Sequence, residues 1–289
     1  MQIILAEPRG FCAGVTRAVQ SLENAVERFG TPIYVYHEIV HNTWIVEDFR
    51  RKGVIFVDTV DEVPEGSRLM FSAHGVSPAI RKLADERLLH TIDATCPLVQ
   101  KVHDSAIDYA QKGYKIILIG HREHNEIIGV VGAVPDSIWV VENEAEIDSL
   151  TFGKEEKLAY LTQTTLAIAE TFQRIERLKE CFPQIVGPPQ SNICGATQSR
   201  QDAVRELSPQ ADVVIVVGSQ SSSNSRRLAE QAEKLGVRSF LVDGAEDIPL
   251  NEFTGNETVL ITAGASAPEH LVQGCVDLLK ERFGAVAIN

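Results

Sequence analysis

The feature that most constrains the fold is an order of segments that occurs three times along the 289 residues. Each copy opens with a cysteine at the start of a helical pattern and continues through a strand-like apolar run into a polar loop. A second apolar run and a second polar loop follow. This alternation is typical of parallel α/β units, and an internal repeat bears on the whole architecture. We predict an α/β fold of three pseudo-symmetric, trefoil-like units with parallel-strand cores, spanning residues 1–95, 96–193 and 194–289.

Matching positions in the three copies carry cysteines and polar side chains. The cysteines are Cys12, Cys96 and Cys194, which lie 84 and 98 residues apart. The first loops contain His41 with Asn42, His124 with Glu126, and Ser222 with Ser223 and Asn224. The second loops contain His74, Thr164 and Ser266. Ligands collect at the carboxyl ends of parallel strands, so units arranged about a centre would direct the cysteines and loops to one point. Three generic α/β units in a row would not explain the matched spacings.

Three cysteines with no obvious fourth fit a cubane iron-sulfur cluster in which one iron lacks a protein ligand. Such an iron can act as a Lewis acid toward a substrate oxygen as well as an electron relay. A zinc site of three cysteines with His41, His74 or His124 is the alternative, although structural zinc sites have closer ligand spacing. The remaining cysteines, Cys181 and Cys275, lie in helical patterns and are expected to be core residues.

The polar loops are rich in neutral donors and lie at predicted helix N-termini, which suit a phosphate or diphosphate. The segment GSQSSSNS would be a flexible linker if it stood alone. The buried strand before it and the helix after it favour capping and donor roles instead. Glu126 is the carboxylate in these loops that is placed to deliver a proton, and Thr164 is suited to position it.

Composition, charge and motif content limit the binding partners and the cellular compartment that we expect for this protein. The net charge of -13 argues against binding along a nucleic acid backbone, which depends on Lys and Arg. Five cysteines in a chain of this length do not indicate a disulfide framework. The sequence has no apolar run of membrane-spanning length and no leader-like pattern after Met1, so we expect a cytoplasmic protein that binds no membrane. It also has no GxGxxG or GxxxxGK motif, so electrons would have to come from a separate carrier protein.

Along nearly its whole length, the sequence resembles the 4-hydroxy-3-methylbut-2-enyl diphosphate reductases of the non-mevalonate pathway of isoprenoid biosynthesis. The matching segments are PRGFCAGV, HEIVHN, FSAHGVS, DATCPLV, ILIGH with the following HNE, TQTTL, SSSNS with RLAE, and TAGASAP. The resemblance implies one [4Fe-4S] cluster held by Cys12, Cys96 and Cys194, with one open iron. It places this cluster at the centre of the threefold fold.

The resemblance also implies a reaction and the roles of side chains. The reaction is a two-electron reductive dehydroxylation of an allylic alcohol, giving isopentenyl and dimethylallyl diphosphate and water, with flavodoxin or ferredoxin as the electron donor. Glu126 would donate the proton, with Thr164 beside it at the substrate hydroxyl. The residues implied to bind the diphosphate are His41, His74, His124, Ser222, Ser223, Asn224 and Ser266. We expect a monomer.

Three positions depart from the family pattern, and two other functions stay open. Gly195 stands where tyrosine is expected, Ser199 where asparagine is common, and Asn125 where proline is more usual. Some relatives carry a C-terminal tail that extends beyond the position of Asn289. The alternatives are a hydratase or dehydratase with the same open-iron cluster and no net electron transfer, and a non-catalytic iron-sulfur sensor. Consumption of reductant in step with product separates the reductase from the dehydratase.

Overall fold

The computed structural model describes residues 1–189 and 192–288, and its strands form three sheets in which every pairing is parallel. The five-stranded sheet has the order β10 (Arg238–Val242), β9 (Val213–Val217), β11 (Thr258–Ala263), β1 (Gln2–Leu5) and β12 (Val286–Ile288). The four-stranded sheet has the order β3 (Val54–Val57), β2 (Ile33–Tyr36), β4 (Arg68–Phe71) and β5 (His90–Asp93). The three-stranded sheet has the order β7 (Ile138–Val141), β6 (Lys115–Ile119) and β8 (Leu158–Thr162). The predicted α/β class with parallel-strand cores is confirmed.

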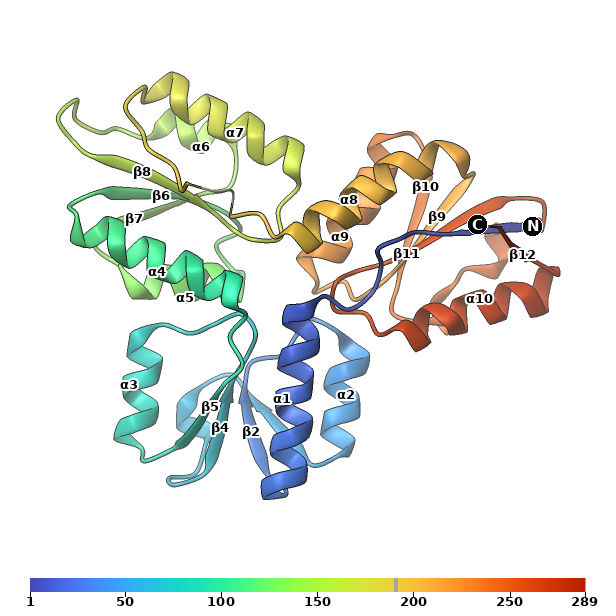
Figure 1. Ribbon diagram of the computed structural model, residues 1–289, viewed down its shortest axis with the longest axis horizontal. Coiled ribbons are helices and arrows are strands. Elements are labelled where there is room, and N and C mark those ends of the chain that lie inside the picture. Colours follow the sequence, from blue (N-terminus) through green and yellow to red (C-terminus); the bar gives the residue numbers. More distant parts are fainter. Residues whose placement is uncertain (190–191, 289) are drawn as a thin grey trace. The chain divides into compact units, whose positions relative to one another are not determined.

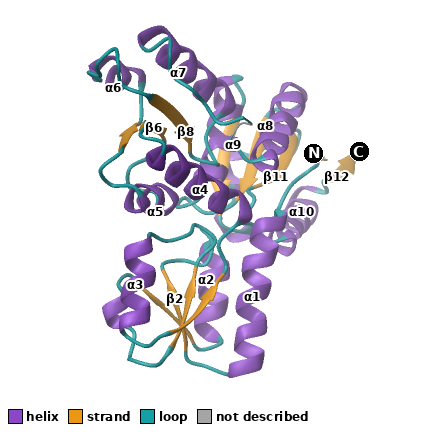
Figure 2. Ribbon diagram, turned by 60° about the vertical axis from the view of Figure 1, so that its left-hand side comes forward, coloured by secondary structure: helices purple, strands orange, loops and turns teal. Residues whose placement is uncertain are grey.

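Helices pack against the faces of these sheets (Figure 1; Figure 2). On the five-stranded sheet, α8 (Gly195–Leu207) and α9 (Ser223–Lys234) cover one face, and α10 (Glu269–Phe283) covers the other. On the three-stranded sheet, α4 (Pro97–Gln111) and α5 (Asn125–Ala133) lie opposite α6 (Glu144–Ser149) and α7 (Ile168–Cys181). The helix α3 (Pro78–Glu86) packs on the four-stranded sheet.

Strand β9 shows why these segments form buried parallel sheets. Its sequence, VVIVV, is apolar throughout, and all five residues are buried. Val213, Ile215 and Val217 belong to the core cluster on the α10 side. Val214 and Val216 belong to the cluster formed with α8 and α9. Successive side chains of a strand point to opposite faces, so a sheet covered on both faces needs a continuous apolar run.

The chain folds into two compact units, and the cut between them differs from the predicted boundaries. Unit 1 consists of Met1–Thr16, His41–Asp48 and Gly195–Asn289, and unit 2 of Arg17–Val40 and Phe49–Cys194. Helices α1 (Ala13–Phe29) and α2 (Thr43–Arg51) each run from unit 1 into unit 2. The division at residues 95/96 and 193/194, and an arrangement of three units about a centre, stay predictions.

The first strand belongs to the C-terminal sheet rather than to the sheet of the first predicted unit. Gln2 pairs with Thr258 on one side and with Val286 on the other. The short apolar run at residues 3–5 predicts a strand, but the run itself carries no signal for its partner strand. The range 1–95 therefore does not correspond to one sheet.

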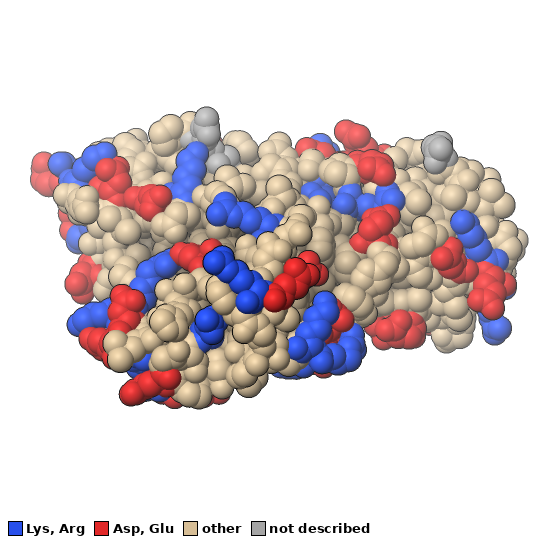
Figure 3. Space-filling model, turned by 60° about the horizontal axis from the view of Figure 1, so that its bottom comes forward, with Lys and Arg blue, Asp and Glu red and all other residues tan. Residues whose placement is uncertain are grey.

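The surface carries both signs of charge. On the face drawn in Figure 3, Lys and Arg side chains lie beside Asp and Glu side chains. The chain has 27 basic and 40 acidic residues. Within the described residues, no helix combines the length and apolar character needed to cross a membrane.

Candidate active site

Each candidate metal-binding cysteine stands where a helix begins. Cys12 directly precedes α1, Cys96 is the N-cap residue of α4, and Cys194 directly precedes α8. Backbone N–H groups near a helix start can donate to a ligand sulfur and tune the metal group that it holds. Cys12 Sγ accepts such a bond from the Val15 N–H at 3.4 Å. The three thiols are partly exposed, and none of the chain's five cysteines, all of them in the described part, forms a disulfide.

Each of these cysteines is also tied to a polar loop by its backbone N–H. The donor and acceptor pairs are Cys12 to the Ala265 carbonyl at 3.1 Å, Cys96 to the Ala73 carbonyl at 3.0 Å, and Cys194 to the Thr164 carbonyl at 2.9 Å. The acceptors lie in the second polar loops, which carry Ser266, His74 and Thr164. The same cysteine-to-loop hydrogen bond therefore occurs three times, but in each case the cysteine and the loop come from different copies of the repeat. Each loop holds the cysteine that opens the following copy, and the last loop holds the first cysteine.

The other two cysteines have a different environment. Cys275 is a residue of α10 and is fully buried in the core, and burial raises the pKa of its thiol to about 12. Cys181 is partly buried against the core of the three-stranded sheet. Among residues 1–189 and 192–288, no group of three or more His, Cys, Asp and Glu side chains is gathered for a single metal ion. Cys12 belongs to unit 1, and Cys96 and Cys194 belong to unit 2, so convergence of the three stays a prediction.

In unit 1, four loops from distant parts of the sequence are linked by hydrogen bonds. The Ser266 hydroxyl donates to the His41 carbonyl at 2.8 Å. The Thr43 N–H donates to Ser219 Oγ at 2.8 Å, and the Ser219 hydroxyl donates to an Asp243 carboxylate oxygen. The structure therefore brings the predicted His41, Ser266 and Ser222–Asn224 loops together in one unit. The sequence analysis did not identify Ser219 or Asp243, because nothing in their local patterns specifies partners that lie 176 residues away for Thr43 and Ser219 and 24 residues away for Ser219 and Asp243.

The same region contains buried polar atoms that have no hydrogen-bond partner. They are Ser223 Oγ, Asn224 Oδ1, Asn224 Nδ2 and Asn42 Nδ2. Ser223 and Asn224 are the first two residues of α9, and the Ser222 hydroxyl caps this helix by accepting from the Ser225 N–H at 3.3 Å. Buried polar groups are nearly always satisfied in a working protein. Hydroxyl and amide groups at a helix N-terminus suit an anion with several acceptor oxygens.

Two glycines make room for the diphosphate cradle, the name used here for Ser222, Ser223 and Asn224 at the start of α9. A Cβ at Gly218 or at Gly264 would overlap the side chain of Ser225. Ser225 Oγ lies 3.0 Å from Ser222 Oγ, in the first turn of α9. The glycines therefore let the ends of β9 and β11 approach the helix start closely.

Replacing Ser219 with alanine tests how the loops of unit 1 are held. The variant leaves the Thr43 N–H and the Asp243 carboxylate without this partner. We expect the free energy of unfolding to fall by about 1–3 kcal/mol, and the affinity for inorganic diphosphate to fall with it. Chemical denaturation and calorimetry measure the two effects. Ser221→Ala is the matched control, since Ser221 is exposed in the same loop. Equal behaviour of the two variants would contradict this role of Ser219.

In unit 2, Glu126 and Thr164 form the pair that the sequence predicted. Glu126 is 1% exposed, in the first turn of α5. Its carboxylate accepts from the Thr164 N–H and from the Thr164 hydroxyl, each at 2.8 Å. Burial raises the pKa of Glu126 to about 7, against the opposing effect of the bonds from Thr164. The carboxyl group can therefore hold or release a proton near neutral pH.

His124 and His74 lie beside this pair. His124 is the N-cap residue of α5, and its Nδ1 accepts from the Glu126 N–H at 3.2 Å. The remaining nitrogen, Nε2, then carries the proton of a neutral imidazole. The His74 ring is 5.8 Å from the His124 ring, and its Nδ1 lies 3.2 Å from Ser72 Oγ. The structure thus gathers the four predicted residues of unit 2, His74, His124, Glu126 and Thr164, on neighbouring loops.

A buried glutamine that the sequence did not single out joins the loops of the three-stranded sheet. Gln163 Oε1 accepts from the His121 N–H at 3.0 Å, and its Nε2 donates to Thr165 Oγ1 at 2.9 Å. Gln163 is fully buried. It therefore holds the loop that leads to Glu126 against the loop of Thr164. The sequence could have indicated Gln163 through its position in the segment TQTTL, directly after a buried strand.

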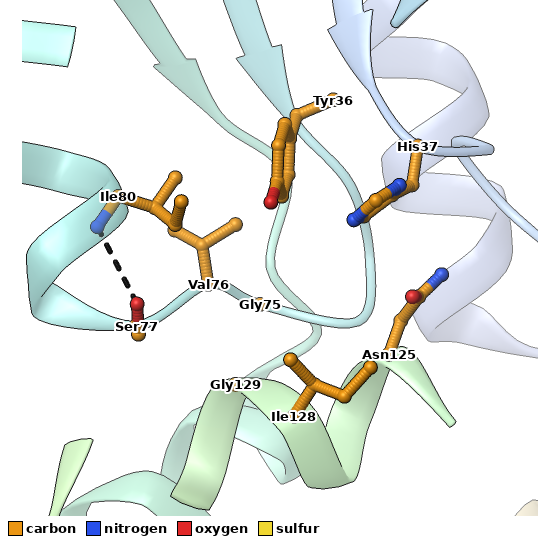
Figure 4. Close-up of a pocket in the computed structure, with 9 residues that line it drawn as sticks. All are labelled: Tyr36, His37, Gly75, Val76, Ser77, Ile80, Asn125, Ile128 and Gly129. Atoms are coloured by element: carbon orange, nitrogen blue, oxygen red, sulfur yellow. Dashed lines mark hydrogen bonds between the residues drawn. The ribbon is translucent and has the colours of Figure 1, made fainter. Parts of the chain in front are cut away.

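A pocket in unit 2 is lined by residues next to His74 and His124 in the sequence (Figure 4). Its lining includes Gly75, which follows His74, and Asn125, which precedes Glu126. Figure 4 shows His37 and Asn125 on one side of the pocket and Val76 and Ile80 on the other. Asn125, one of the departures from the family pattern, thus lines this pocket directly before Glu126 in the sequence. At Gly195, another departure, an added Cβ would meet nothing within 4 Å.

Comparison with known proteins identifies relatives along the whole chain. The family model described as LytB protein matches residues 3–280. A 4-hydroxy-3-methylbut-2-enyl diphosphate reductase of Rhodopirellula baltica is 58% identical over 285 residues, which cover 99% of this chain and 89% of that protein. A reductase of the same name from Pseudomonas aeruginosa is 51% identical, covering 97% and 91%.

Two solved structures agree with these relatives. The E-1-hydroxy-2-methyl-but-2-enyl-4-diphosphate reductase from Plasmodium falciparum has a TM-score of 0.97 and 39% identity, covering 100% of this chain and 91% of that one. An (E)-4-hydroxy-3-methyl-but-2-enyl diphosphate reductase, described as the terminal enzyme of the non-mevalonate pathway, has a TM-score of 0.68 and 31% identity. It covers 97% of this chain and 100% of its own.

Proposed function

This chain belongs to the LytB protein family, and we propose that it is a 4-hydroxy-3-methylbut-2-enyl diphosphate reductase, the enzyme of the last step of the non-mevalonate pathway. The proposal is carried by full-length similarity to enzymes of that name. In the reaction, the allylic C–O bond breaks and a C–H bond forms. Two electrons and two protons are consumed, and isopentenyl or dimethylallyl diphosphate leaves together with water.

Cys12, Cys96 and Cys194 would hold one [4Fe-4S] cluster with one iron free of protein ligands. The fit rests on the chemistry and setting of the donors. Each of the three thiols is partly exposed at a helix start and is fixed by a backbone bond to a polar loop. Cys275, by contrast, is sealed in a core. When bound, such a cluster supplies electrons and a Lewis-acidic iron.

The diphosphate would bind to the two sets of polar loops. In unit 1, Ser222, Ser223 and Asn224 at the start of α9 offer hydroxyl, amide and backbone donors, with His41 and Ser266 in neighbouring loops. In unit 2, His74 and His124 offer imidazole donors. Polar atoms of Ser223 and Asn224 are buried without partners, which supports an anion that completes their hydrogen bonds.

Glu126 would give the proton to the leaving hydroxyl. Its raised pKa, about 7, keeps a large part of the carboxyl group protonated at neutral pH. The Thr164 hydroxyl donates to the Glu126 carboxylate at 2.8 Å and would stand beside the substrate hydroxyl. Both side chains are buried, so bulk water has little access to this step.

The remaining assignments complete the proposal. Flavodoxin or ferredoxin would deliver the electrons, and the enzyme would work as a cytoplasmic monomer without nucleic acid or membrane partners. The excess of acidic residues, 40 against 27 basic ones, supports the lack of nucleic acid binding.

Replacing Asn224 with alanine tests the diphosphate cradle. A hydrogen bond to a charged group contributes about 1.5–3 kcal/mol, so the affinity for inorganic diphosphate should fall about 10- to 100-fold. The free energy of unfolding should stay equal or rise, because the alanine removes two buried polar atoms that have no partner in the protein. Titration calorimetry and chemical denaturation measure these quantities. The exposed Asn256→Ala is the control, and equal affinities of the two variants would contradict the assignment.

The stoichiometry of electrons tests the reaction type. A reductase consumes two electrons of an anaerobic chemical reductant for each five-carbon product. Loss of water from the same substrate without consumption of reductant, giving a product more unsaturated than isopentenyl diphosphate, would instead indicate the dehydratase with an open iron. A cluster-loaded protein that turns over nothing would indicate a sensor.

A further inference from the structure

A buried arginine outside the residues described so far contacts the segment that carries Cys12. Arg200, in the middle of α8, is 3% exposed. Its guanidinium donates to the Gly10 carbonyl through Nη2 at 2.6 Å and through Nε at 3.2 Å. Nη2 also lies 3.4 Å from the Phe11 carbonyl, and Nη1 donates to the Ala196 carbonyl at 2.7 Å. The planar fork of arginine can make these bonds together, which a lysine ammonium cannot.

The segment is held from its other edge as well. The Gly10 N–H donates to the Ala263 carbonyl at 3.3 Å, and the Cys12 N–H donates to the Ala265 carbonyl at 3.1 Å. Gly10 has a φ of 65°, which favours glycine, and a Cβ there would lie 3.2 Å from the Ala267 carbonyl. The peptide group between Phe11 and Cys12 is thus fixed at its oxygen by Arg200 and at its nitrogen by the loop after β11.

We infer that Arg200 is a positioning residue that fixes Cys12 for its metal group and joins the Cys12 segment to the helix that follows Cys194. The helix α8 begins at Gly195, the residue after Cys194. Arg200 lies five residues after the start of this helix. Its side chain donates hydrogen bonds both to Ala196, in the first turn of α8, and to the segment that carries Cys12. One side chain therefore constrains the backbone next to two of the three proposed ligands. The inference rests on the proposed function, because it takes those cysteines as cluster ligands.

The guanidinium also places a cation in the interior beside the segment of Cys12. A buried positive charge favours the more negative, reduced form of a nearby metal group, because charges interact more strongly where water is excluded. Arg200 should therefore affect the reduction potential as well as the retention of the cluster. A residue that only stabilised the fold would not shift the potential.

Two substitutions separate geometry from charge. Arg200→Gln removes the fork and the charge, and Arg200→Lys removes the fork alone. Loss of a group that hydrogen-bonds to a metal ligand or orients it typically lowers metal affinity 10- to 100-fold. Both variants should therefore release iron to a chelator at least about tenfold faster than the wild-type protein. In Arg200→Gln, the reduction equilibrium should also shift about tenfold toward the oxidised form, which is about 59 mV for one electron. Arg200→Lys should keep the wild-type potential.

Arg205→Gln is the matched control, because Arg205 lies on the same helix with a side chain that is 56% exposed and pairs with Asp202. The control should match the wild-type protein in iron release and in potential. Iron release at the control's rate in both Arg200 variants would overturn the inference. The inference would also be overturned if Arg200→Gln released iron faster but kept the wild-type reduction potential, and if the metal-free variant were destabilised to the same extent as the iron-loaded variant. That result would assign Arg200 a role in the stability of the fold alone. If Arg200→Gln does not fold, iron release from Arg200→Lys decides alone. Iron and sulfide are counted first on the wild-type protein, since their absence after anaerobic preparation would contradict the proposed function instead.

Discussion

Glu126→Gln should lower turnover about a thousandfold while the cluster and the affinity for diphosphate stay close to those of the wild-type protein. General acid catalysis typically contributes about 10²- to 10⁴-fold, and an amide cannot supply the proton. Glutamine keeps the size of the side chain, and its oxygen can still accept one of the two bonds from Thr164. Anaerobic turnover, iron content and diphosphate binding, measured on one preparation, check the three parts of this expectation.

The matched control for this prediction is Glu123→Gln, because Glu123 is exposed in the same loop. It should turn over at the wild-type rate. If Glu126→Gln retained turnover within threefold of this control, Glu126 would not be the proton donor. If it lost the cluster or the diphosphate affinity instead, its role would be structural.

The raised pKa of Glu126 also fixes the direction of two pH effects. Turnover by the wild-type protein should fall as the pH rises through about 7, where the carboxyl group loses its proton. For stability, the folded protein binds this proton up to about pH 7, whereas the unfolded chain releases it near the ordinary value of 4.5. The contribution of Glu126 to stability is therefore complete below pH 4.5 and is lost as the pH rises through 7.

Glu126→Gln should abolish this dependence. Between about pH 4.5 and pH 8, the free energy of unfolding of the variant should shift relative to that of the wild-type protein by about 3 kcal/mol in the variant's favour. Denaturation curves at the two pH values give this difference. A difference that does not change with pH would show that burial does not raise the pKa of Glu126.

The second large effect is expected at the cysteines. Serine at Cys12, Cys96 or Cys194 should remove most of the cluster iron and lower turnover more than about a hundredfold, since even outer contacts of metal ligands are worth 10- to 100-fold. Cys275→Ala and Cys181→Ser are the controls, because neither thiol lies at a helix start beside a polar loop. Both should retain iron. Iron content and turnover that follow the controls in any one of the three variants would remove that cysteine from the ligand set.

Much of the fold could be predicted from local patterns. The apolar runs of β6 and β9 specify strands buried on both faces, and their regular alternation with helices specifies parallel sheets. The cysteines at helix starts and the pairing of Glu126 with Thr164 also followed from position within the repeat. These features depend on short segments and on their order, which a sequence displays directly.

The rest depends on contacts between distant segments. Strand β1 joins β11, at the other end of the chain, and each cysteine is held by the loop of a different copy of the repeat. The bonds among Thr43, Ser219 and Asp243 form the same kind of long-range contact. A hydroxyl or carboxyl group bonds to whichever partner folding brings near. Its sequence neighbours therefore say little about that partner.

The most direct test of the proposed function is product analysis after anaerobic reaction of the iron-loaded protein with a chemical reductant and 4-hydroxy-3-methylbut-2-enyl diphosphate. We predict that isopentenyl diphosphate and dimethylallyl diphosphate both form and that their sum equals half the number of electrons consumed. Unchanged substrate from a preparation with a full complement of iron and sulfide would contradict the proposed reaction.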